Sequence, residues 1–507
     1  MRKLLLLALV GCGGAKSMYV AEAMPSMPYA GAPRPEAVET TESYTDYGKN
    51  PWIDASKDHL STFAADVDTA SYTIARTKLN GNVLPPPPSV RVEEWVNYFH
   101  YSFPGGGSPF AVVMDAAAHP FAPDRYVLRV GVATHAKPAS ERKPSHLVFL
   151  VDVSGSMDEP NKLPLAKQAL HILTDNLTAK DSVALVTYAG ATRLVLPMTS
   201  IDDKARIHHA IDSLSANGST AMASGIDLAY EQASKWLRPG EISRVIVCTD
   251  GDANVGPHST QELLSLIESR AKQGVALSTI GFGMGNYKDS MMEQLADKGN
   301  GNNYYIDSID MAKRVFADQL TSTLEVAAKD VKLQVDFDPA LVTHYRLIGY
   351  ENRDLADKDF RKDDVPAGQV GWGHQVTAMY EVELTDAGKT QPFGVVRIRH
   401  KQPEADHAVE DAFAMQTAPA PAFAAASPDL RFAFAVAAFA DVLRGGADWS
   451  LSDIRALAQG AAGDDKDRIE LVSLIEKARA IRPEQKVAAP VAKVAQPTPE
   501  LATPSGR

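Results

Sequence analysis

The stretch Val151-Asp152-Val153-Ser154-Gly155-Ser156-Met157 decides the fold, and it follows a short apolar run that begins at His146. This run has the length and composition of a buried β-strand, and the glycine and polar residues after it predict a turn. Asp152, Ser154 and Ser156 occupy alternate positions, so we expect one carboxylate and two hydroxyls to converge at the edge of a sheet. Oxygen donors of this kind suit a hard cation such as Mg²⁺. The alternative interpretation is a polar turn from strand to helix, in which a serine caps the helix.

Two later stretches extend this pattern, namely Gly218-Ser219-Thr220-Ala221 and Thr249-Asp250-Gly251-Asp252. Together with the first stretch they resemble the metal-ion-dependent adhesion site of von Willebrand factor type A (VWA) domains, in which Asp-x-Ser-x-Ser is followed by a Thr and then by an Asp. The resemblance implies that side chains from all three stretches bind one divalent cation, Mg²⁺ or Mn²⁺. In this sequence those side chains are Asp152, Ser154, Ser156, Thr220 and Asp250.

Strand and helix patterns alternate from about residue 143 to residue 328. This alternation predicts an α/β fold with a doubly wound, mostly parallel sheet and helices on both faces, as in the Rossmann-like VWA domain. The predicted strands are 146–152, 181–188, 244–249, 275–281 and 303–306, with 193–197 antiparallel at one edge. The predicted helices are 162–177, 204–214, 221–237, 259–273, 288–298 and 308–327, and Ser259 with Glu262 forms a capping box.

This topology would explain how distant residues share one ion. In open α/β sheets, ligands bind beyond the carboxyl ends of the strands, near the point where the strand order reverses. We expect the strands that end at Asp152 and Asp250 to be neighbours at that point, and Thr220 to come from a third loop at the same rim.

The N-terminus has the form of a secretory signal. Two basic residues precede the apolar residues 4–10, a run too short to span a bilayer. The next residues complete Leu9-Val10-Gly11-Cys12, which resembles the lipobox of bacterial lipoproteins. The resemblance implies cleavage before Cys12 and acylation of that residue, and several acyl chains anchor a protein more firmly than one. Gly13 follows the cysteine, which fits an outer-membrane location facing the periplasm. The alternative is an ordinary secretory signal with an incidental cysteine.

The length of 507 residues predicts several domains. The stretches Val90-Arg91-Val92-Glu93-Glu94-Trp95-Val96-Asn97-Tyr98-Phe99 and Tyr345-Arg346-Leu347-Ile348-Gly349-Tyr350-Glu351-Asn352-Arg353 resemble the small domains that flank the VWA module in a family of bacterial VWA lipoproteins. We expect residues 110–132 to join the later β-rich segment in one sandwich, and residues 403–428 to form a loop or linker. The expected organisation is a lipoprotein signal peptide at 1–12, a flexible tether at 13–60, an N-terminal flanking domain at 61–142, the VWA domain at 143–328, a C-terminal flanking domain that is β-rich and then helical at 329–482, and a disordered tail at 483–507.

Three further residues have ordinary structural interpretations. Asp66 and Asp68 could bind a metal, but they precede a helical pattern, so we expect them to form the turn and cap the helix. Cys248 lies in an apolar predicted strand, and the only other cysteine is Cys12. We therefore expect Cys248 to be a buried core residue without a disulfide partner.

The net charge of −12 argues against a nucleic-acid-binding protein. The VWA resemblance implies a protein partner that supplies a carboxylate to the metal, and the lipobox places this contact at the cell envelope. One alternative is an envelope scaffold, in which the ion is structural and the flanking domains bind the partner. A metal-dependent hydrolase is the other, but hydrolytic metals usually have histidine ligands and a nearby base. Neither His146 nor the pair His208-His209 is placed at this rim by the sequence, so we expect no enzyme.

Overall fold

The computed structural model describes residues 41–65, 67–104, 109–219, 221–251 and 259–482, all within one compact unit that begins at Thr41. The expected signal peptide with Cys12, residues 13–40 of the expected tether and the expected tail lie outside the described residues. No helix in these described ranges is long and apolar enough to cross a membrane.

Residues 41–60, which we expected to belong to the flexible tether, are instead packed against the rest of the chain. The backbone N–H of Thr41 donates to the carbonyl of Gly285 at 2.8 Å. The carboxylate of Glu42 pairs with Lys78 at 2.7 Å, and Ile53–Asp54 form strand β1. Polar contacts and single apolar side chains, such as the buried Ala55, hold this segment, and these contacts follow no hydrophobic period in the sequence.

The α/β part contains a six-stranded sheet with the order β10-β9-β8-β5-β6-β7. All neighbouring pairs are parallel except β6 and β7, which confirms the predicted antiparallel edge. The doubly wound α/β prediction is therefore confirmed. The strands are β5 Ser145–Asp152, β6 Ser182–Tyr188, β7 Arg193–Ser200, β8 Ile242–Thr249, β9 Val275–Gly281 and β10 Asn303–Tyr305.

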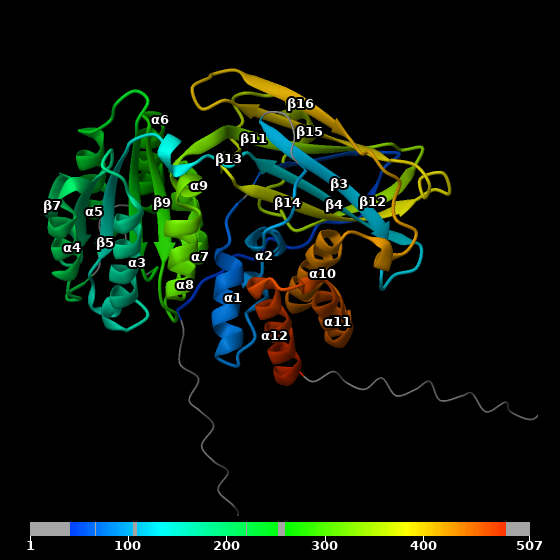
Figure 1. Cartoon of the computed structure of the whole chain (residues 1–507), viewed down its shortest axis with the longest axis horizontal. Helices are drawn as coiled ribbons and strands as arrows, with labels where there is room; N and C mark the ends of the chain where they lie inside the picture. The colour runs from blue at the N-terminus through cyan, green and yellow to red at the C-terminus, as the bar shows by residue number, and fades with distance from the viewer. Residues whose placement is uncertain (1–40, 66, 105–108, 220, 252–258, 483–507) are drawn as a thin grey trace, which may run out of the picture. The chain divides into compact units, whose positions relative to one another are not determined.

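Helices cover both faces of this sheet (Figure 1). Leu147, Phe149 and Val151 of β5 pack in one core with helices α3, α4, α8 and α9, whereas Val148 and Leu150 pack in a second core with α5, α6 and α7. The helices are α3 Leu163–Asn176, α4 Lys204–Asp212, α5 Met222–Ser234, α6 Thr260–Lys272, α7 Asp289–Lys298, α8 Ile309–Lys313 and α9 Leu320–Leu324.

Two sequence predictions in this region can be compared directly with the structure. The capping box of α6 is confirmed, because the Ser259 side chain accepts from the Glu262 N–H while the Glu262 carboxylate accepts from the Ser259 N–H. The last predicted helix, 308–327, is instead two short helices joined by a π-helical segment at Arg314–Asp318. It ends at Leu324 because residues from Val326 onward enter a strand, where sheet pairing overrides the helical pattern.

The strands outside the α/β part form two further sheets, with orders β1-β12-β14-β4-β3 and β13-β11-β15-β16, and β2 also pairs with β11. The side chains that face each other between these sheets form one core. Across this core the ring centroids of Phe337 on β11 and Tyr380 on β14 are 5.5 Å apart. The pairing of β4 with β14 confirms the expected joint sandwich. The remaining strands are β2 Leu60–Ala64, β3 Phe110–Ala118, β4 Arg125–Thr134, β11 Val326–Phe337, β12 Val342–Ile348, β13 Gly368–Gly371, β14 Gln375–Leu384, β15 Gly394–Lys401 and β16 Ala408–Ala414. Strand β16 lies in the segment expected to be a loop, so that expectation is wrong there.

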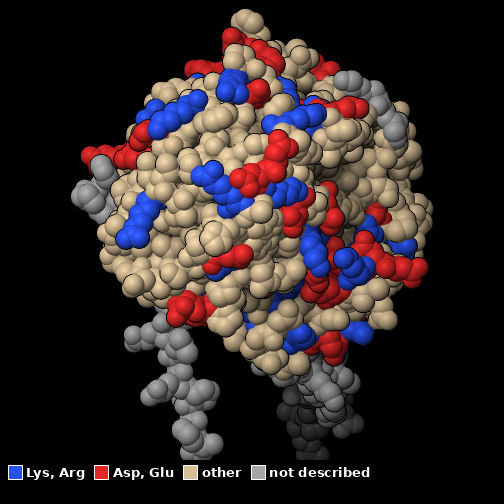
Figure 2. Space-filling model, turned by 60° about the vertical axis from the view of Figure 1, so that its left-hand side comes forward, with Lys and Arg blue, Asp and Glu red and all other residues tan. Residues whose placement is uncertain are grey.

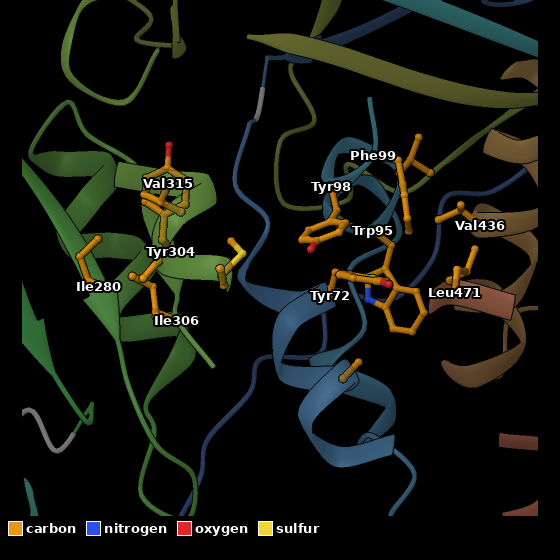
Figure 3. Close-up of a cluster of buried hydrophobic side chains, with 14 of the residues drawn as sticks. Tyr72, Trp95, Tyr98, Phe99, Ile280, Tyr304, Ile306, Val315, Val436 and Leu471 are labelled. Atoms are coloured by element: carbon orange, nitrogen blue, oxygen red, sulfur yellow. The ribbon is translucent and has the colours of Figure 1, made fainter. Parts of the chain in front are cut away.

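A helical layer joins residues from both ends of the described chain. Helix α2 (Val92–Tyr98) places Trp95 against Phe439 of α10 (Pro428–Leu443), with ring centroids 5.4 Å apart. Figure 3 shows Tyr72 of α1 (Ala70–Asn80) beside Trp95, and Leu471 of α12 (Lys466–Ile481) in the same cluster. Helix α11 (Leu451–Ala462) completes this layer. Trp95 meets the rings of Tyr72 and Phe439 edge to face, an arrangement that stabilises aromatic pairs beyond their burial.

The capping expectation for Asp68 is wrong, and Asp66 lies outside the described residues. Helix α1 begins after Thr69, and no side chain caps it. The Asp68 carboxylate is buried instead and accepts from the N–H of Asn303 at 2.9 Å. Because Asn303 begins the edge strand β10, the carboxylate ties the start of α1 to the edge of the α/β sheet.

Candidate metal site

Strand pairing brings the two predicted acidic positions to one rim. Strands β5 and β8 are parallel neighbours, with Val151 opposite Cys248, so Asp152 and Asp250 lie at adjacent carboxyl ends. Strand β6 lies on the other side of β5, so the strand order reverses here as predicted. Cys248 is fully buried in β8, as expected, and forms no disulfide with any described residue. Burial raises the pKa of its thiol to about 12.

The loop after β5 folds back on its own carboxylate. The Oδ1 atom of Asp152 accepts from the backbone N–H of Ser154 at 2.9 Å, and the hydroxyls of Ser154 and Ser156 are 3.1 Å apart. A short 3₁₀ segment, Gly155–Asp158, follows. Ser154 is buried, while Ser156 is half-buried at the rim. The structure therefore brings the predicted carboxylate and both predicted hydroxyls of this loop together.

Asp152 is a buried carboxylate for which the described residues supply no cationic partner. Its Oδ2 atom accepts from the hydroxyl of Thr249 at 3.0 Å, and this hydroxyl in turn accepts from the N–H of Gly251. Burial raises the pKa of Asp152 to about 6, and the nearby charge of Asp250 adds to this rise. The metal-free site thus disfavours the charged form of Asp152, which a bound divalent cation would stabilise.

Asp250 has partners that the sequence analysis did not identify. Its Oδ2 atom accepts from Lys162 Nζ at 3.2 Å and from Asn286 Nδ2 at 2.9 Å. Lys162 is buried, and its stem lies against Gly283, where any side chain would collide with it. The absence of a side chain at Gly283 therefore leaves room for this lysine. No local pattern marks Lys162 or Asn286, because their roles depend on where separate loops meet.

Thr220 lies outside the described residues, so its hydroxyl is not placed. The segment just before it is placed and contacts the loop after β5. The Gly155 N–H donates to the Gly218 carbonyl at 3.0 Å, and the Asn217 N–H donates to the Val153 carbonyl at 2.7 Å. Two of the three predicted loops are thus hydrogen-bonded to each other at the rim.

The donor set fits a hard divalent cation. The described candidates are two carboxylates and two hydroxyls, all oxygen donors, which Mg²⁺ and Mn²⁺ prefer over nitrogen and sulfur. No cluster of three or more His, Cys, Asp or Glu side chains suited to a metal occurs among the described residues. A site with hydroxyl ligands does not require such a cluster. Asp152, Ser154 and Ser156 would hold the ion, and Lys162 would limit the negative charge around it.

Comparisons with known proteins agree with this architecture. Residues 146–318 match the family described as von Willebrand factor type A domain, and residues 38–129 match the family described as von Willebrand factor. Residues 322–481 match the family described as uncharacterized protein YfbK, C-terminal. The three matches therefore extend over the α/β part and the segments on both sides of it.

Individual relatives match different shares of this chain. Uncharacterized protein YfbK of Escherichia coli (strain K12) is 38% identical over 473 residues, which cover 87% of this chain and 82% of that protein. Uncharacterized protein sll0103 of Synechocystis sp. is 27% identical and covers 45% of this chain and 54% of that protein. Among solved structures, a von Willebrand factor type A protein from Catenulispora acidiphila matches with a TM-score of 0.42 and 18% identity, covering 76% of this chain and 91% of that one.

Proposed function

Because the chain belongs to the YfbK family of VWA-domain proteins, we propose that it binds a protein partner through a divalent cation at this rim. The cation is Mg²⁺ or Mn²⁺, held by Asp152, Ser154, Ser156, Thr220 and Asp250. The protein acts at the bacterial cell envelope, anchored through acylated Cys12, most simply in the outer membrane facing the periplasm. The anchor is supported by the lipobox-like sequence Leu9-Val10-Gly11-Cys12.

The observation that carries this proposal is the buried carboxylate of Asp152, which lies beside two hydroxyls and has no cationic partner among the described residues. An isolated buried charge is costly unless it is paired or coordinates a metal. Mg²⁺ prefers six oxygen ligands and often keeps several waters, so a cation bound here retains a position for an incoming ligand. A carboxylate from a partner protein is a hard anion that fits this position.

The charges around the rim favour a metal-gated contact. In the absence of a cation the site holds two carboxylates, and among the described residues only that of Asp250 forms an ion pair, with Lys162. An acidic partner group would be repelled until a divalent cation reverses the local charge. On the face drawn in Figure 2, acidic and basic side chains are interspersed. This pattern supports a protein partner, since protein surfaces that bind nucleic acid usually carry a basic stripe.

Binding rather than hydrolysis is also supported by where the histidines lie. His146 is near the amino end of β5, opposite the rim, and contacts Ser182 and Glu241. His208 is on α4 and contacts residues of α3. Neither of these two histidines, which the sequence offered as candidates, is therefore placed to act as a general base at the rim.

The test is capture of a partner from solubilised envelope extract by the immobilised full-length chain, with Mg²⁺ or with a chelator. We expect one or more proteins to bind only with Mg²⁺, and Thr220→Ala to reduce their capture to the background level. Ser265→Ala is the matched control, because this exposed hydroxyl on α6 contacts only the carbonyl of Gln261 among described residues. It should capture as much as the unmodified chain.

Other outcomes favour the alternatives. If the metal-free chain and Thr220→Ala capture the same partner equally well, the flanking domains bind it and the ion is structural. If the captured protein is instead cleaved at a rate that depends on the metal, the site is hydrolytic.

A further inference from the structure

Five arginines of the described chain are buried, and one of them differs from the rest. Four have carboxylate partners, and these pairs are Arg76 with Asp307, Arg91 with Glu94, Arg129 with Asp115 and Arg142 with Asp181. The fifth is Arg244, near the amino end of β8, which is 3% exposed and forms no ion pair with any described residue. A buried charge is costly unless it is paired. Arg244 is therefore a buried cation whose charge the described residues do not balance.

The guanidinium group of Arg244 is only partly hydrogen-bonded. Its Nη1 atom donates to the Ser278 hydroxyl at 2.6 Å, and its Nη2 atom donates to the Leu324 carbonyl over a long 3.4 Å. Its Nε atom has no partner among the described residues. A guanidinium group carries five N–H bonds, so these contacts leave donors for a ligand. Burial lowers the pKa of Arg244 to about 10, and the groups that oppose this fall are Tyr304 and Tyr230 rather than a carboxylate. The side chain therefore remains charged at pH 7.

Arg244 lines a cavity of about 470 Å³ between the α/β part and the sandwich. Ala276 on β9 lies opposite Arg244, so the two side chains are on one face of the sheet, and Ala276 lines the same cavity. Leu324, whose carbonyl contacts Nη2, lines it as well. The sandwich contributes Lys329 of β11 to the facing wall. A cavity of this size, where two parts of a molecule meet, is a common place for a small ligand.

The charges around this cavity leave a second cation unmatched. Lys329, like Arg244, forms no ion pair with a described residue, whereas the other lysines of the lining do. Three of the four carboxylates in the lining have basic partners, and these pairs are Glu241 with Arg238, Glu325 with Lys137 and Asp330 with Lys401. The fourth carboxylate, that of Asp406, is exposed. The unmatched charge inside the cavity is therefore positive.

We propose that this cavity binds a small anionic ligand, and that Arg244 holds the phosphate or carboxylate group of that ligand. A guanidinium group presents its N–H bonds in a planar fork, which fits two oxygens of either group. Lys329 is the second cation, so a bound ligand contacts both the α/β part and the sandwich. The site is separate from the candidate metal site, because Asp250 follows the opposite end of β8, about 20 Å away along the strand.

The test is calorimetric titration of sodium phosphate, and separately of sodium succinate, into the full-length chain at constant ionic strength. A chelator is present, because divalent cations bind phosphate. We expect one anion per chain, with binding about 10-fold weaker or more in Arg244→Met and about 3-fold weaker in Lys329→Met. The tighter of the two anions shows which group the cavity prefers. Arg193→Met is the matched control, because Arg193 is an exposed arginine of β7 that does not line the cavity. It should bind both anions like the unmodified chain.

Urea unfolding separates a ligand-binding role of Arg244 from a structural one. Without an anion, Arg244→Met should be at least as stable as Arg193→Met, because methionine removes an unbalanced buried charge. Phosphate or succinate should stabilise the unmodified chain and Arg193→Met but not Arg244→Met.

Three results would overturn the proposal. One is equal anion affinity in Arg244→Met and Arg193→Met, which would place the anion elsewhere. Another is the absence of saturable binding of both anions at millimolar concentrations. The third is an anion-free Arg244→Met that is clearly less stable than Arg193→Met, which would show that Arg244 stabilises the fold by its own contacts.

Discussion

The substitution Asp152→Asn is expected to stabilise the metal-free protein at pH 7 by roughly 3 kcal/mol while abolishing its stabilisation by Mg²⁺. The reason is that burial raises the pKa of Asp152 to about 6, above its ordinary value of 3.8. Each unit of pKa difference between the folded and unfolded states corresponds to about 1.4 kcal/mol. Asparagine retains the acceptor for the Ser154 N–H, and its NH₂ group donates to the Thr249 hydroxyl where the carboxylate accepts from it, so it removes the charge and keeps both contacts.

The pH dependence of this effect has a defined sign. The folded state binds a proton at Asp152 more tightly than the unfolded state, so the wild-type protein loses stability relative to Asp152→Asn as the pH rises from about 4 to about 6. Below about pH 4 the advantage of the variant disappears, and above about pH 6 it is constant. Urea unfolding in chelator at pH 4, 5, 6 and 7 measures it. A variant that is less stable than wild type in chelator at pH 7 would contradict the account, as would undiminished Mg²⁺ stabilisation of the variant.

Replacing Arg91 by methionine is expected to lower the free energy of unfolding by about 3–5 kcal/mol, because it leaves buried carboxylates without their cation. Arg91 precedes α2 and pairs with Glu94 on that helix and with Asp289 on α7. It also lies 3.8 Å from Glu293 on α7. Burial raises the pKa of Glu293 to about 7, and Arg91 is the strongest influence that opposes this rise. The substitution therefore weakens the connection between α2 and the α/β part.

The control for this prediction is Arg361→Met. Arg361 forms a bidentate ion pair with Glu410, in which its Nη2 and Nε atoms lie 2.8 and 2.9 Å from the two carboxylate oxygens. The Arg361 side chain is nevertheless 64% exposed. Exposed pairs contribute less than about 1 kcal/mol because water screens them. Urea unfolding of both variants in the presence of Mg²⁺ gives the comparison. If both substitutions lower the free energy of unfolding by the same small amount, Arg91 does not stabilise the contact between α2 and α7.

Much of the α/β part was predictable because its signals are local. Apolar runs identified the strands, and the antiparallel edge at β7 followed from the hairpin with β6. The neighbouring positions of β5 and β8 followed from the general order of doubly wound sheets, which was enough to bring Asp152 and Asp250 to one rim. The capping box at Ser259 was a short-range pattern of the same kind.

The flanking parts were less predictable because their contacts join distant residues. Strand β2 pairs with β11, with Ser61 opposite Val335, and no local period indicates that partner. Lys162 and Asn286 reach Asp250 from two different loops, so their roles emerge only once the sheet is assembled.

The most direct measurement is the anomalous scattering of Mn²⁺ in crystals of the full-length chain grown with that ion. We expect one strong peak at the carboxyl ends of β5 and β8, in direct contact with oxygens of Asp152, Ser154, Ser156 and Thr220. Its solvent side should be occupied by water or by a carboxylate from another molecule. An Mn²⁺ peak only elsewhere would contradict the account, and so would a Thr220 hydroxyl farther from Asp152 than a hydrated cation could bridge.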